Sequence, residues 1–135
     1  MIIRHFDEIA ASSQAVHADN WSSFRLLTRK DGMGFSLHET WIHPGTETHI
    51  WYKNHLEAVY CIEGEGEIQP LHGSEEAPTP GEPITIQPGT MYALDKHDRH
   101  LLRATTRLRL ICVFDPPLRG DEVHGPDGAY PPDPE

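Results

Sequence analysis

The feature that most constrains the fold of this chain is a series of short strand-like runs separated by turn residues. The breaks carry Asp-Gly, Pro-Gly and Gly-Glu-Gly, and no long amphipathic helix is present in the sequence. Many short strands at near-regular spacing are typical of an all-β sandwich or barrel, with room here for at most one or two short helices, one of them within residues 7–20. The predicted strands span residues 2–6, 24–29, 35–42, 56–64, 67–71, 83–87, 91–95, 100–104 and 108–114.

The length of the chain favours a single domain. At 135 residues it can bury one core but not two, so we expect one domain over residues 1–135. Residues 72–83 are rich in Pro, Gly, Ser and Glu, which predicts an exposed loop. Residues 131–135 predict a frayed tail, because proline has no N–H to donate to a strand.

The charge balance argues against a nucleic-acid partner. Eleven Lys and Arg stand against 21 Asp and Glu, giving a formal net charge of −10, whereas phosphate binding needs clustered cations. An acidic surface serves general solubility or work in a salty, solute-rich cytosol, and the sequence leaves both readings open.

Signals for a membrane or an oxidising compartment are missing from the sequence. No apolar run approaches the roughly 18 residues that cross a bilayer, and the first residues do not form a signal peptide. Cys61 and Cys112 are too far apart in sequence to be a close-spaced metal or redox pair. Two free thiols suit a reducing compartment, so we expect no membrane partner and a cytoplasmic location.

Residues 45–64 keep the spacing of a known β-barrel motif but replace two of its residues. The first cupin motif is Gly, five residues, His, one residue, His, three or four residues, Glu, six residues and Gly. Gly45, Glu57 and Gly64 fall in register, while the two histidine positions hold Trp51 and Lys53. The stretch therefore resembles a cupin motif without its paired metal-binding histidines, and it predicts a small cupin β-barrel or jelly-roll.

Strand alternation predicts that a carboxylate lies inside this barrel. Side chains two positions apart in a strand share a face, so Glu57 points the same way as Val59 and Cys61. A carboxylate among apolar neighbours needs a partner cation or a metal. The final predicted strand likewise directs a set of apolar residues to one side: Leu108, Leu110, Cys112 and Phe114.

A second motif supplies candidate partners for Glu57. The second cupin motif ends Pro-x-Gly-x-x-His, and in a tighter version here Tyr92 stands at the histidine position. Residues 94–98 predict a turn that folds His100 back beside Tyr92 across a hairpin. Two oxygens and one imidazole nitrogen then converge, a set that suits Fe(II) or Mn(II) before Zn(II).

The spacing alone leaves other readings of these residues open. Glu57 also fits an internal salt bridge, Tyr92 a core aromatic residue, and His100 a strand histidine whose hydrogen bonds are satisfied within the protein. His97, at the tip of the predicted turn, is a rival to His100 as a ligand.

Long stretches of the chain, the two motifs included, resemble one family of cupins, the ectoine synthases, over about residues 1–131. The stretches are DNW at 19–21, KDGMGFSLHET at 30–40, GTETHI at 45–50, NHLEAVYCIEGEGEI at 54–68, PGTMYALDKHDRH at 88–100 and CVFDPPLRGDEVHGPDGAYP at 112–131. The resemblance implies a homodimer that closes the small-molecule substrate N4-acetyl-L-2,4-diaminobutyrate to L-ectoine, a compatible solute, with loss of water. It also implies an iron-type metal, Fe(II) with Mn(II) or Zn(II) as alternatives, held by Glu57, Tyr92 and His100.

The resemblance further implies a set of pocket residues. Proton transfer is expected from His55, Glu122 or His124. Substrate contacts are expected from Trp21, Arg25, Thr40, Tyr52, Cys112 and Phe114. Among these, Arg25 is a candidate clamp for the substrate carboxylate, although a surface strand charge is the alternative.

Two positions depart from the family pattern. Relatives usually carry a histidine where Trp51 stands, and an aromatic or polar residue where His38 stands. We expect the change at Trp51 to affect packing or access more than metal binding.

The alternatives to an ectoine synthase are another iron-dependent cupin enzyme, either a dioxygenase or a sugar-modifying one, and a non-catalytic cupin that binds a small solute.

Overall fold

The computed structural model describes residues 1–132, which form eleven short strands and two short helices. The helices are α1 (Phe6–Ala10) and the 3-10 helix η1 (Arg29–Asp31). The strands are β1 (Ala15–His17), β2 (Trp21–Leu27), β3 (Ser36–Ile42), β4 (Glu47–Ile50), β5 (Leu56–Glu63), β6 (Gly66–Gly73), β7 (Pro78–Pro80), β8 (Ile84–Ile86), β9 (Met91–Leu94), β10 (His100–Ala104) and β11 (Leu108–Asp115).

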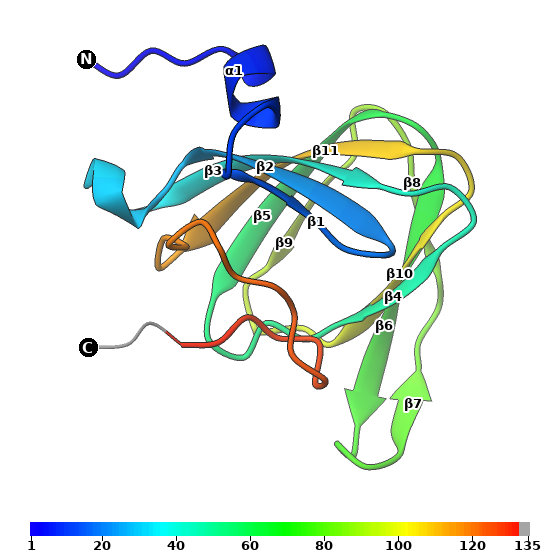
Figure 1. Ribbon diagram of the computed structural model, residues 1–135. Helices are drawn as coiled ribbons and strands as arrows, with labels where there is room; N and C mark the ends of the chain where they lie inside the picture. The colour runs from blue at the N-terminus through cyan, green and yellow to red at the C-terminus, as the bar shows by residue number, and fades with distance from the viewer. Residues whose placement is uncertain (133–135) are drawn as a thin grey trace.

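Two antiparallel sheets face each other and enclose the core (Figure 1). The first sheet has six strands in the order β1-β2-β3-β11-β5-β9. The second has the order β4-β10-β6-β7, with β8 also paired to β6. The expected all-β architecture is therefore confirmed, and no helix among residues 1–132 is long and apolar enough to cross a membrane.

The predicted strands agree with the structure in all but one run. Residues 2–5 form no strand, and residue 6 begins α1, where His5 accepts a hydrogen bond from the backbone N–H of Asp7 and so caps the helix. The prediction missed β1, β4 and β7, which are only three or four residues long. Residues 72–83 are mostly exposed, but β6 and β7 pair within them to form a hairpin. In the predicted tail, residues 131–132 are exposed, and residues 133–135 lie outside the described part.

The predicted alternation of faces is confirmed along β5 and β11. Glu57, Val59 and Cys61 are all buried while the residues between them are exposed. On β11, all four residues predicted to share a face lie in the core: Leu108, Leu110, Cys112 and Phe114.

The motif glycine Gly64 has a physical reason for its identity. Its φ angle is +94°, a backbone conformation that side-chain-bearing residues rarely adopt. A Cβ atom there would collide with the backbone carbonyl of Arg107, because the turn after β5 passes directly over the turn before β11. Gly64 thus allows the two turns to approach closely and sets the entry of the chain into β6.

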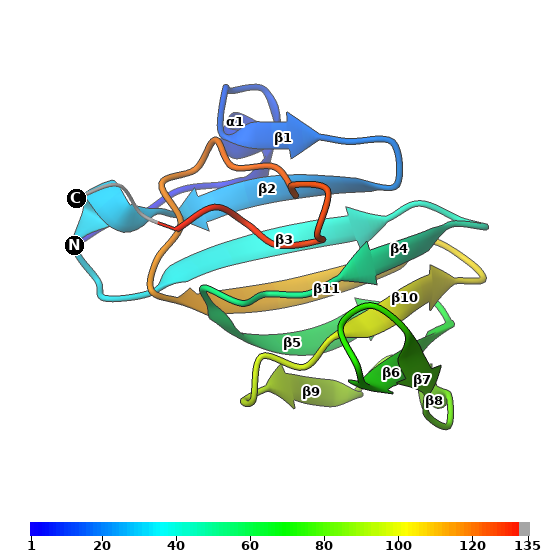
Figure 2. The same ribbon diagram turned by 90° about the horizontal axis from the view of Figure 1, so that it is seen from below.

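After β11 the chain leaves the first sheet and crosses one end of the space between the two sheets (Figures 1 and 2). We call residues 122–130 the C-terminal strap. The carbonyl of Gly128 accepts a hydrogen bond of 2.8 Å from the backbone N–H of Trp51, and the side chain of Asn54 donates one of 2.9 Å to the carbonyl of Tyr130. These bonds fix the strap to the segment between β4 and β5.

Candidate active site

A small cavity of ≈ 30 Å³ lies between the two sheets under the C-terminal strap. Eight of the residues predicted for the site line it: Trp21, Thr40, Tyr52, Glu57, Tyr92, Cys112, Phe114 and His124. The other four, Arg25, His55, His100 and Glu122, are buried at between 0% and 4% exposure without lining it. The structure therefore gathers the predicted set in and around one interior space.

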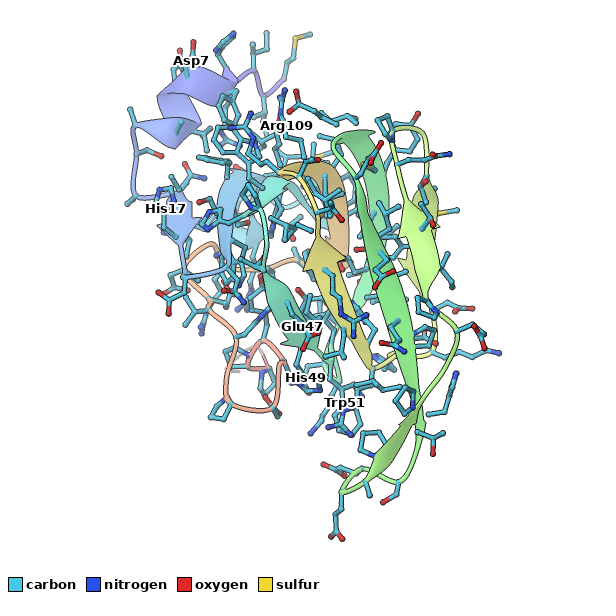
Figure 3. All side chains as sticks on the ribbon, turned by 90° about the vertical axis from the view of Figure 1, so that its right-hand side faces the viewer. Asp7, His17, Glu47, His49, Trp51 and Arg109 are labelled. Atoms are coloured by element: carbon cyan, nitrogen blue, oxygen red, sulfur yellow. The ribbon has the colours of Figure 1, made fainter. Side chains whose placement is uncertain are left out.

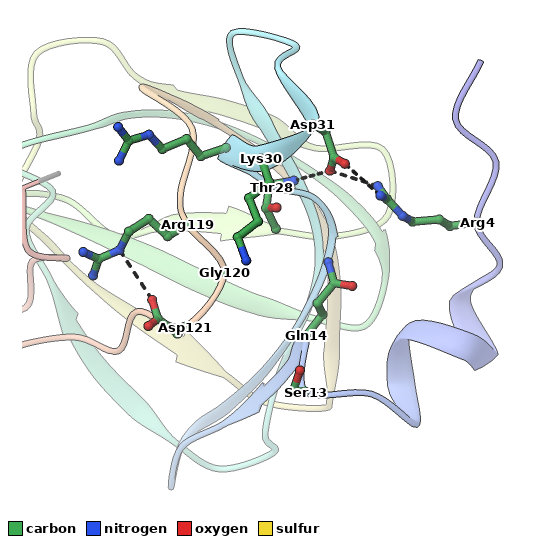
Figure 4. A pocket seen from close by; sticks show the side chains of 10 residues that line it. Arg4, Ser13, Gln14, Thr28, Lys30, Asp31, Arg119, Gly120 and Asp121 are labelled. Carbon is green, nitrogen blue, oxygen red and sulfur yellow. Dashed lines mark hydrogen bonds and ion pairs between the residues drawn. The ribbon is translucent and has the colours of Figure 1, made fainter. Parts of the chain in front are cut away.

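A larger hollow lies elsewhere, outside the barrel, with a volume of ≈ 790 Å³. It lies between the N-terminal residues, η1 and residues 119–121 (Figure 4). Much of its charge is paired internally, since Arg4 contacts Asp31 at 2.7 Å and Arg119 contacts Asp121 at 3.5 Å. None of the predicted site residues lines this hollow.

Glu57, Tyr92 and His100 come from three strands, but their arrangement differs from the expected hairpin. Strand β9 pairs with β5, and β10 belongs to the other sheet, so the predicted pairing of Tyr92 and His100 across a hairpin is wrong. The two rings instead face each other across the interior with centroids 6.5 Å apart. Tyr92 lies opposite Val59, which makes Glu57 its diagonal neighbour on the same face of the sheet.

The imidazole of His100 is held in one orientation and has one free nitrogen. Its Nδ1 lies 2.9 Å from the backbone carbonyl of Asp98; a carbonyl only accepts, so Nδ1 carries the proton. In the neutral ring, Nε2 then presents a lone pair, and this buried atom has no hydrogen-bond partner within residues 1–132. A backbone carbonyl that fixes the far nitrogen is the usual support of a metal-binding histidine.

The carboxyl group of Glu57 is buried without a balancing cation. Burial raises its pKa to about 8, and a hydrogen bond from Cys112 offsets only part of that effect. Burial also raises the pKa of the Tyr92 phenol well above its ordinary value. Both groups carry negative charge easily only when a positive charge lies between them.

The donor set fits a divalent cation. Among residues 1–132, no three His, Cys, Asp or Glu side chains gather in a metal-binding arrangement. A metal held here would therefore need another type of donor as well, such as the phenol of Tyr92, which lines the cavity. A free imidazole nitrogen and two acidic oxygens that a bound cation would help to ionise are donors that suit such an ion.

Arg25 is a buried cation, so its alternative reading as a surface charge is wrong. The side chain is fully buried and lies between the rings of Trp21 and Tyr130, with its guanidinium carbon 6.0 Å and 5.8 Å from their centroids. It donates to Ser23 at 3.0 Å and to the carbonyl of Glu122 at 2.9 Å. Its Nη1 has no hydrogen-bond partner within the described chain.

Glu122 is held as an anion by backbone groups. Its carboxylate accepts hydrogen bonds from the N–H groups of Arg119, Gly120 and Asp121 at 2.8 to 3.1 Å, and it lies 4.0 Å from Arg25. Burial alone would raise its pKa, but these N–H donors and the charge of Arg25 together lower it below its usual value. A carboxylate that is kept ionised in this way is suited to holding Arg25 in position and is poorly suited to accepting and returning a proton.

His124 and Tyr52 form a hydrogen-bonded pair at the cavity. The Tyr52 hydroxyl lies 2.8 Å from Nε2 of His124, and burial lowers the pKa of that imidazole to about 4. Tyr130 completes the group, because its ring stacks on Tyr52 at 5.1 Å and lies 4.6 Å from the ring of His124. The sequence analysis missed Tyr130; an aromatic residue in a stretch rich in Pro and Gly was its one sequence signal.

The remaining histidines have separate positions. His55 is buried beside Phe114 and Tyr130, with ring centroids 6.1 Å and 6.2 Å away. His97 is exposed at a turn with φ +53°, and its Nδ1 lies 2.8 Å from the backbone carbonyl of Tyr52. The rival ligand His97 is therefore engaged by backbone outside the cavity.

The two departures from the family pattern lie outside the cavity lining. His38 is fully buried behind Phe114, with ring centroids 5.2 Å apart. Trp51 follows β4 at the edge of the second sheet, near His49 (Figure 3). Its ring packs between two cations, the ammonium of Lys53 at 4.2 Å and the guanidinium of Arg99 at 4.7 Å.

Comparison with known proteins identifies the family. The family described as ectoine synthase matches residues 1–134 of this chain. The chain belongs to the ectoine synthase family. An L-ectoine synthase from Desulfatibacillum aliphaticivorans is 62% identical over 133 residues, 97% of each chain. The L-ectoine synthase of Halalkalibacterium halodurans is 50% identical over 131 residues, 97% of this chain and 96% of the relative.

Solved structures agree with this assignment. The crystal structure of ectoine synthase from P. lautus has a TM-score of 0.80 at 55% identity, covering 89% of this chain and 81% of that one. An RmlC-like cupin from Shewanella frigidimarina has a TM-score of 0.58 at 18% identity, covering 75% of this chain and 80% of its own. The second likeness concerns the fold alone, and the two together confirm the expected cupin architecture.

Buried neutral histidines predict that the fold loses stability in mild acid. Burial lowers the pKa of His38 well below 6.5, and the charges of Arg25 and His55 add to the effect. The unfolded chain therefore binds more protons below about pH 6.5, and the stability is lost as the pH falls from there toward the folded pKa. Glu57, whose pKa burial raises to about 8, acts in the opposite direction over this range, so the contribution of His38 is measured as a difference between proteins. We expect the free energy of unfolding from urea titrations between pH 7 and 5 to fall less, or to rise more, in His38→Gln than in the unmodified protein, a difference of roughly 1 kcal/mol.

The exposed His72 provides the control for this pH dependence. His72→Gln should leave the slope as it is in the unmodified protein. Equal slopes in His38→Gln and the unmodified protein would contradict the assignment.

Proposed function

We propose that this protein is an L-ectoine synthase, a hydro-lyase that cyclises N4-acetyl-L-2,4-diaminobutyrate to L-ectoine with loss of water. The observation that carries the proposal is the match to the ectoine synthase family over residues 1–134, with relatives at 50–62% identity. The gathering of eight expected residues around one interior cavity supports it.

The reaction requires an amide carbonyl to be activated and a proton to be moved. The α-ammonium of the substrate loses a proton, the free amine attacks the acetamide carbon, and a C–N bond closes a six-membered ring. The former carbonyl oxygen then leaves as water, carrying the proton released first and a second proton from the same α-nitrogen. The ring keeps one N–H on each nitrogen as a cationic amidinium, so that atoms and charge balance without an external reactant. Holding amine and carbonyl in contact contributes up to roughly 7–11 kcal/mol in well-oriented cases.

The metal of this site, Fe(II) with Mn(II) or Zn(II) as alternatives, would be held by Glu57, Tyr92 and His100. A bound divalent ion with open positions acts as a Lewis acid that polarises a carbonyl oxygen. The free Nε2 of His100 and the uncompensated carboxyl of Glu57 support this ligand set. Cys112 keeps Glu57 oriented through a hydrogen bond.

Arg25 binds the substrate carboxylate in this proposal. A guanidinium pairs with a carboxylate through charge-assisted hydrogen bonds, and Nη1 of Arg25 is the buried donor left for it. Glu122 holds Arg25 in place by accepting from it through its backbone carbonyl. Trp21 lies beside the guanidinium and, with Phe114, gives the cavity apolar walls that keep bulk water out.

In this proposal His124 accepts the proton that the α-ammonium of the substrate loses. It lines the cavity, and in the tautomer whose Nε2–H donates to the Tyr52 hydroxyl its Nδ1 carries the lone pair that accepts a proton. Glu122 suits this step less, because backbone N–H groups keep it ionised. His55, buried behind Phe114, stays a candidate only for orienting the wall of the cavity.

A cytoplasmic role in compatible-solute synthesis under osmotic stress follows from this activity. Both cysteines are free and buried, as suits a reducing compartment, and the surface carries excess negative charge. Cell fractionation that recovered the protein outside the cytoplasm would rule this location out.

The activity itself is tested by anaerobic turnover. Fe(II)-loaded protein incubated with N4-acetyl-L-2,4-diaminobutyrate should give the ring product, followed by proton NMR. Arg25→Lys should lower kcat/KM by about 100-fold, because an ammonium cannot form the forked contact. The control Arg103→Lys, on the outer face of β10, should retain activity. If the protein bound the substrate but formed no product at any metal loading, it would be a solute-binding cupin rather than an enzyme.

The ligand set is tested by metal content. Tyr92→Phe and His100→Ala should each lower bound iron at least about tenfold, measured by mass spectrometry of the purified proteins. His97→Ala is the matched control and should load fully. Unchanged metal content in both ligand variants would reject the set and make His97 the next candidate.

We propose a homodimer as the assembled form. Strand β9 is an edge of the six-stranded sheet, and such edges usually need a cover. Apolar side chains are exposed on it and on the N-terminal segment, with Met91 at 62% and Ile3 at 83%. Met91→Lys should sediment as a monomer, whereas Ile84→Lys, an exposed change on β8, should not. A monomer mass for the unmodified protein at working concentration would exclude the dimer.

A further inference from the structure

The interior cavity is too small for the proposed substrate. Its volume is ≈ 30 Å³, whereas small-molecule pockets commonly span roughly 300–1,000 Å³. A second hollow of ≈ 330 Å³ lies at the surface and is lined in part by strap residues. Trp21 and His124 line both spaces, so these two side chains separate the surface hollow from the cavity.

Tyr130 is the strap residue that fills the interior. Its side chain is 4% exposed and lines the cavity, where it contacts residues from β2, β11 and the segment between β4 and β5. The contacts are the guanidinium of Arg25 at 5.8 Å, the ring of Tyr52 at 5.1 Å and the ring of Phe114 at 5.5 Å. The ring thus lies beside Arg25, which does not itself line the cavity.

The placement of Arg25 matters because it is the proposed carboxylate clamp. Its Nη1 is buried without a hydrogen-bond partner in the described chain, 4.0 Å from the carboxylate of Glu122, and the rings of Tyr130 and Trp21 flank the guanidinium. A substrate that reaches Arg25 at one end and the region of Glu57 at the other must therefore occupy space that a strap ring now fills.

We infer that Tyr130 is a displaceable plug of the active site, and that substrate binds only when its ring leaves the space beside Arg25. The inference rests on the proposed function for the identity of the ligand. In this inference Tyr130 does not contact the substrate. It changes the apparent affinity for substrate because only molecules whose Tyr130 ring has moved out can bind it.

The strap is attached in a way that permits this movement. It contains no helix or strand, and Glu122 at its start is held firmly by Arg25. Beyond Glu122 its hydrogen bonds to the barrel are few: Gly128 to Trp51, Tyr130 to Asn54, and His124 to Tyr52. Lys53 and Asp127 add an exposed ion pair at 3.4 Å, which contributes little. Segments with few such bonds open without unfolding the rest of a domain.

The first test needs no ligand. Hydrogen exchange followed by NMR on the metal-loaded protein reports strap opening at the amide of Trp51, whose acceptor is Gly128. We expect this amide to exchange at least about 100-fold faster than amides of β10 and β11, because the strap opens locally. Equal protection would overturn the inference, since Tyr130 could then leave only when the barrel unfolds. This result is independent of whether the protein turns over the proposed substrate.

The second test uses the sign of the change in KM. Tyr130→Ala removes the plug, so KM for N4-acetyl-L-2,4-diaminobutyrate should fall by about threefold or more. Tyr130→Phe keeps the ring and should stay within about twofold of the unmodified protein, and Pro132→Ala, exposed just beyond the strap, should not change KM. A rise in KM for Tyr130→Ala with normal folding would show that Tyr130 contacts substrate and would overturn the inference. If Tyr130→Ala fails to fold, the hydrogen-exchange experiment on the unmodified protein decides whether Tyr130 is a displaceable plug.

A complete lack of turnover in the unmodified protein would instead count against the proposed function.

Discussion

The burial of a carboxyl group without a balancing charge is the constraint on which the rest of the site depends. Glu57 sits on the inner face of β5 among apolar residues, where burial raises its pKa to about 8. Such a group is expensive in a folded core unless something stabilises its charge. The neighbouring phenol of Tyr92 has its pKa raised by the same burial, and the ring of His100, with a free Nε2, lies 6.5 Å from the ring of Tyr92. One cation bound among them would satisfy all three, which is why we place the chemistry there.

A second charge is handled in a different way. Arg25 keeps its charge inside the protein because two aromatic rings flank it and Ser23 and Glu122 accept from it. Glu122 in turn is held by the backbone N–H groups before it, so the strap begins at a fixed point next to Arg25. The acidic group at Glu57 and the cation at Arg25 are therefore positioned by different parts of the fold. Glu57 depends on the two facing sheets, whereas Arg25 depends on β2 and the strap.

The sequence predicted most of the fold and the membership of the site, but not its spatial arrangement. Period-2 alternation placed Glu57 correctly, because a strand buried on one face leaves little choice of side. The hairpin expected between Tyr92 and His100 failed, because the turn after β9 carries the chain to the other sheet, a long-range choice that local turn residues do not encode. Tyr130 was missed for a related reason: its role depends on where the strap crosses the barrel, and its own neighbours in sequence predict only a solvated tail.

The loss of water and the entry of substrate require opposite properties of the C-terminal strap, which limits the small cavity. A reaction that expels water gains from apolar walls and a sealed interior, since water that stays would compete for the polarised carbonyl. An interior space of ≈ 30 Å³ is too small for the substrate, so the segment that limits it has to move. The strap meets both demands because its anchors are unequal: Glu122 at its start is deeply held, whereas its far end relies on a few hydrogen bonds near Trp51. Movement about the firm end withdraws Tyr130 while leaving Arg25 and its support in place.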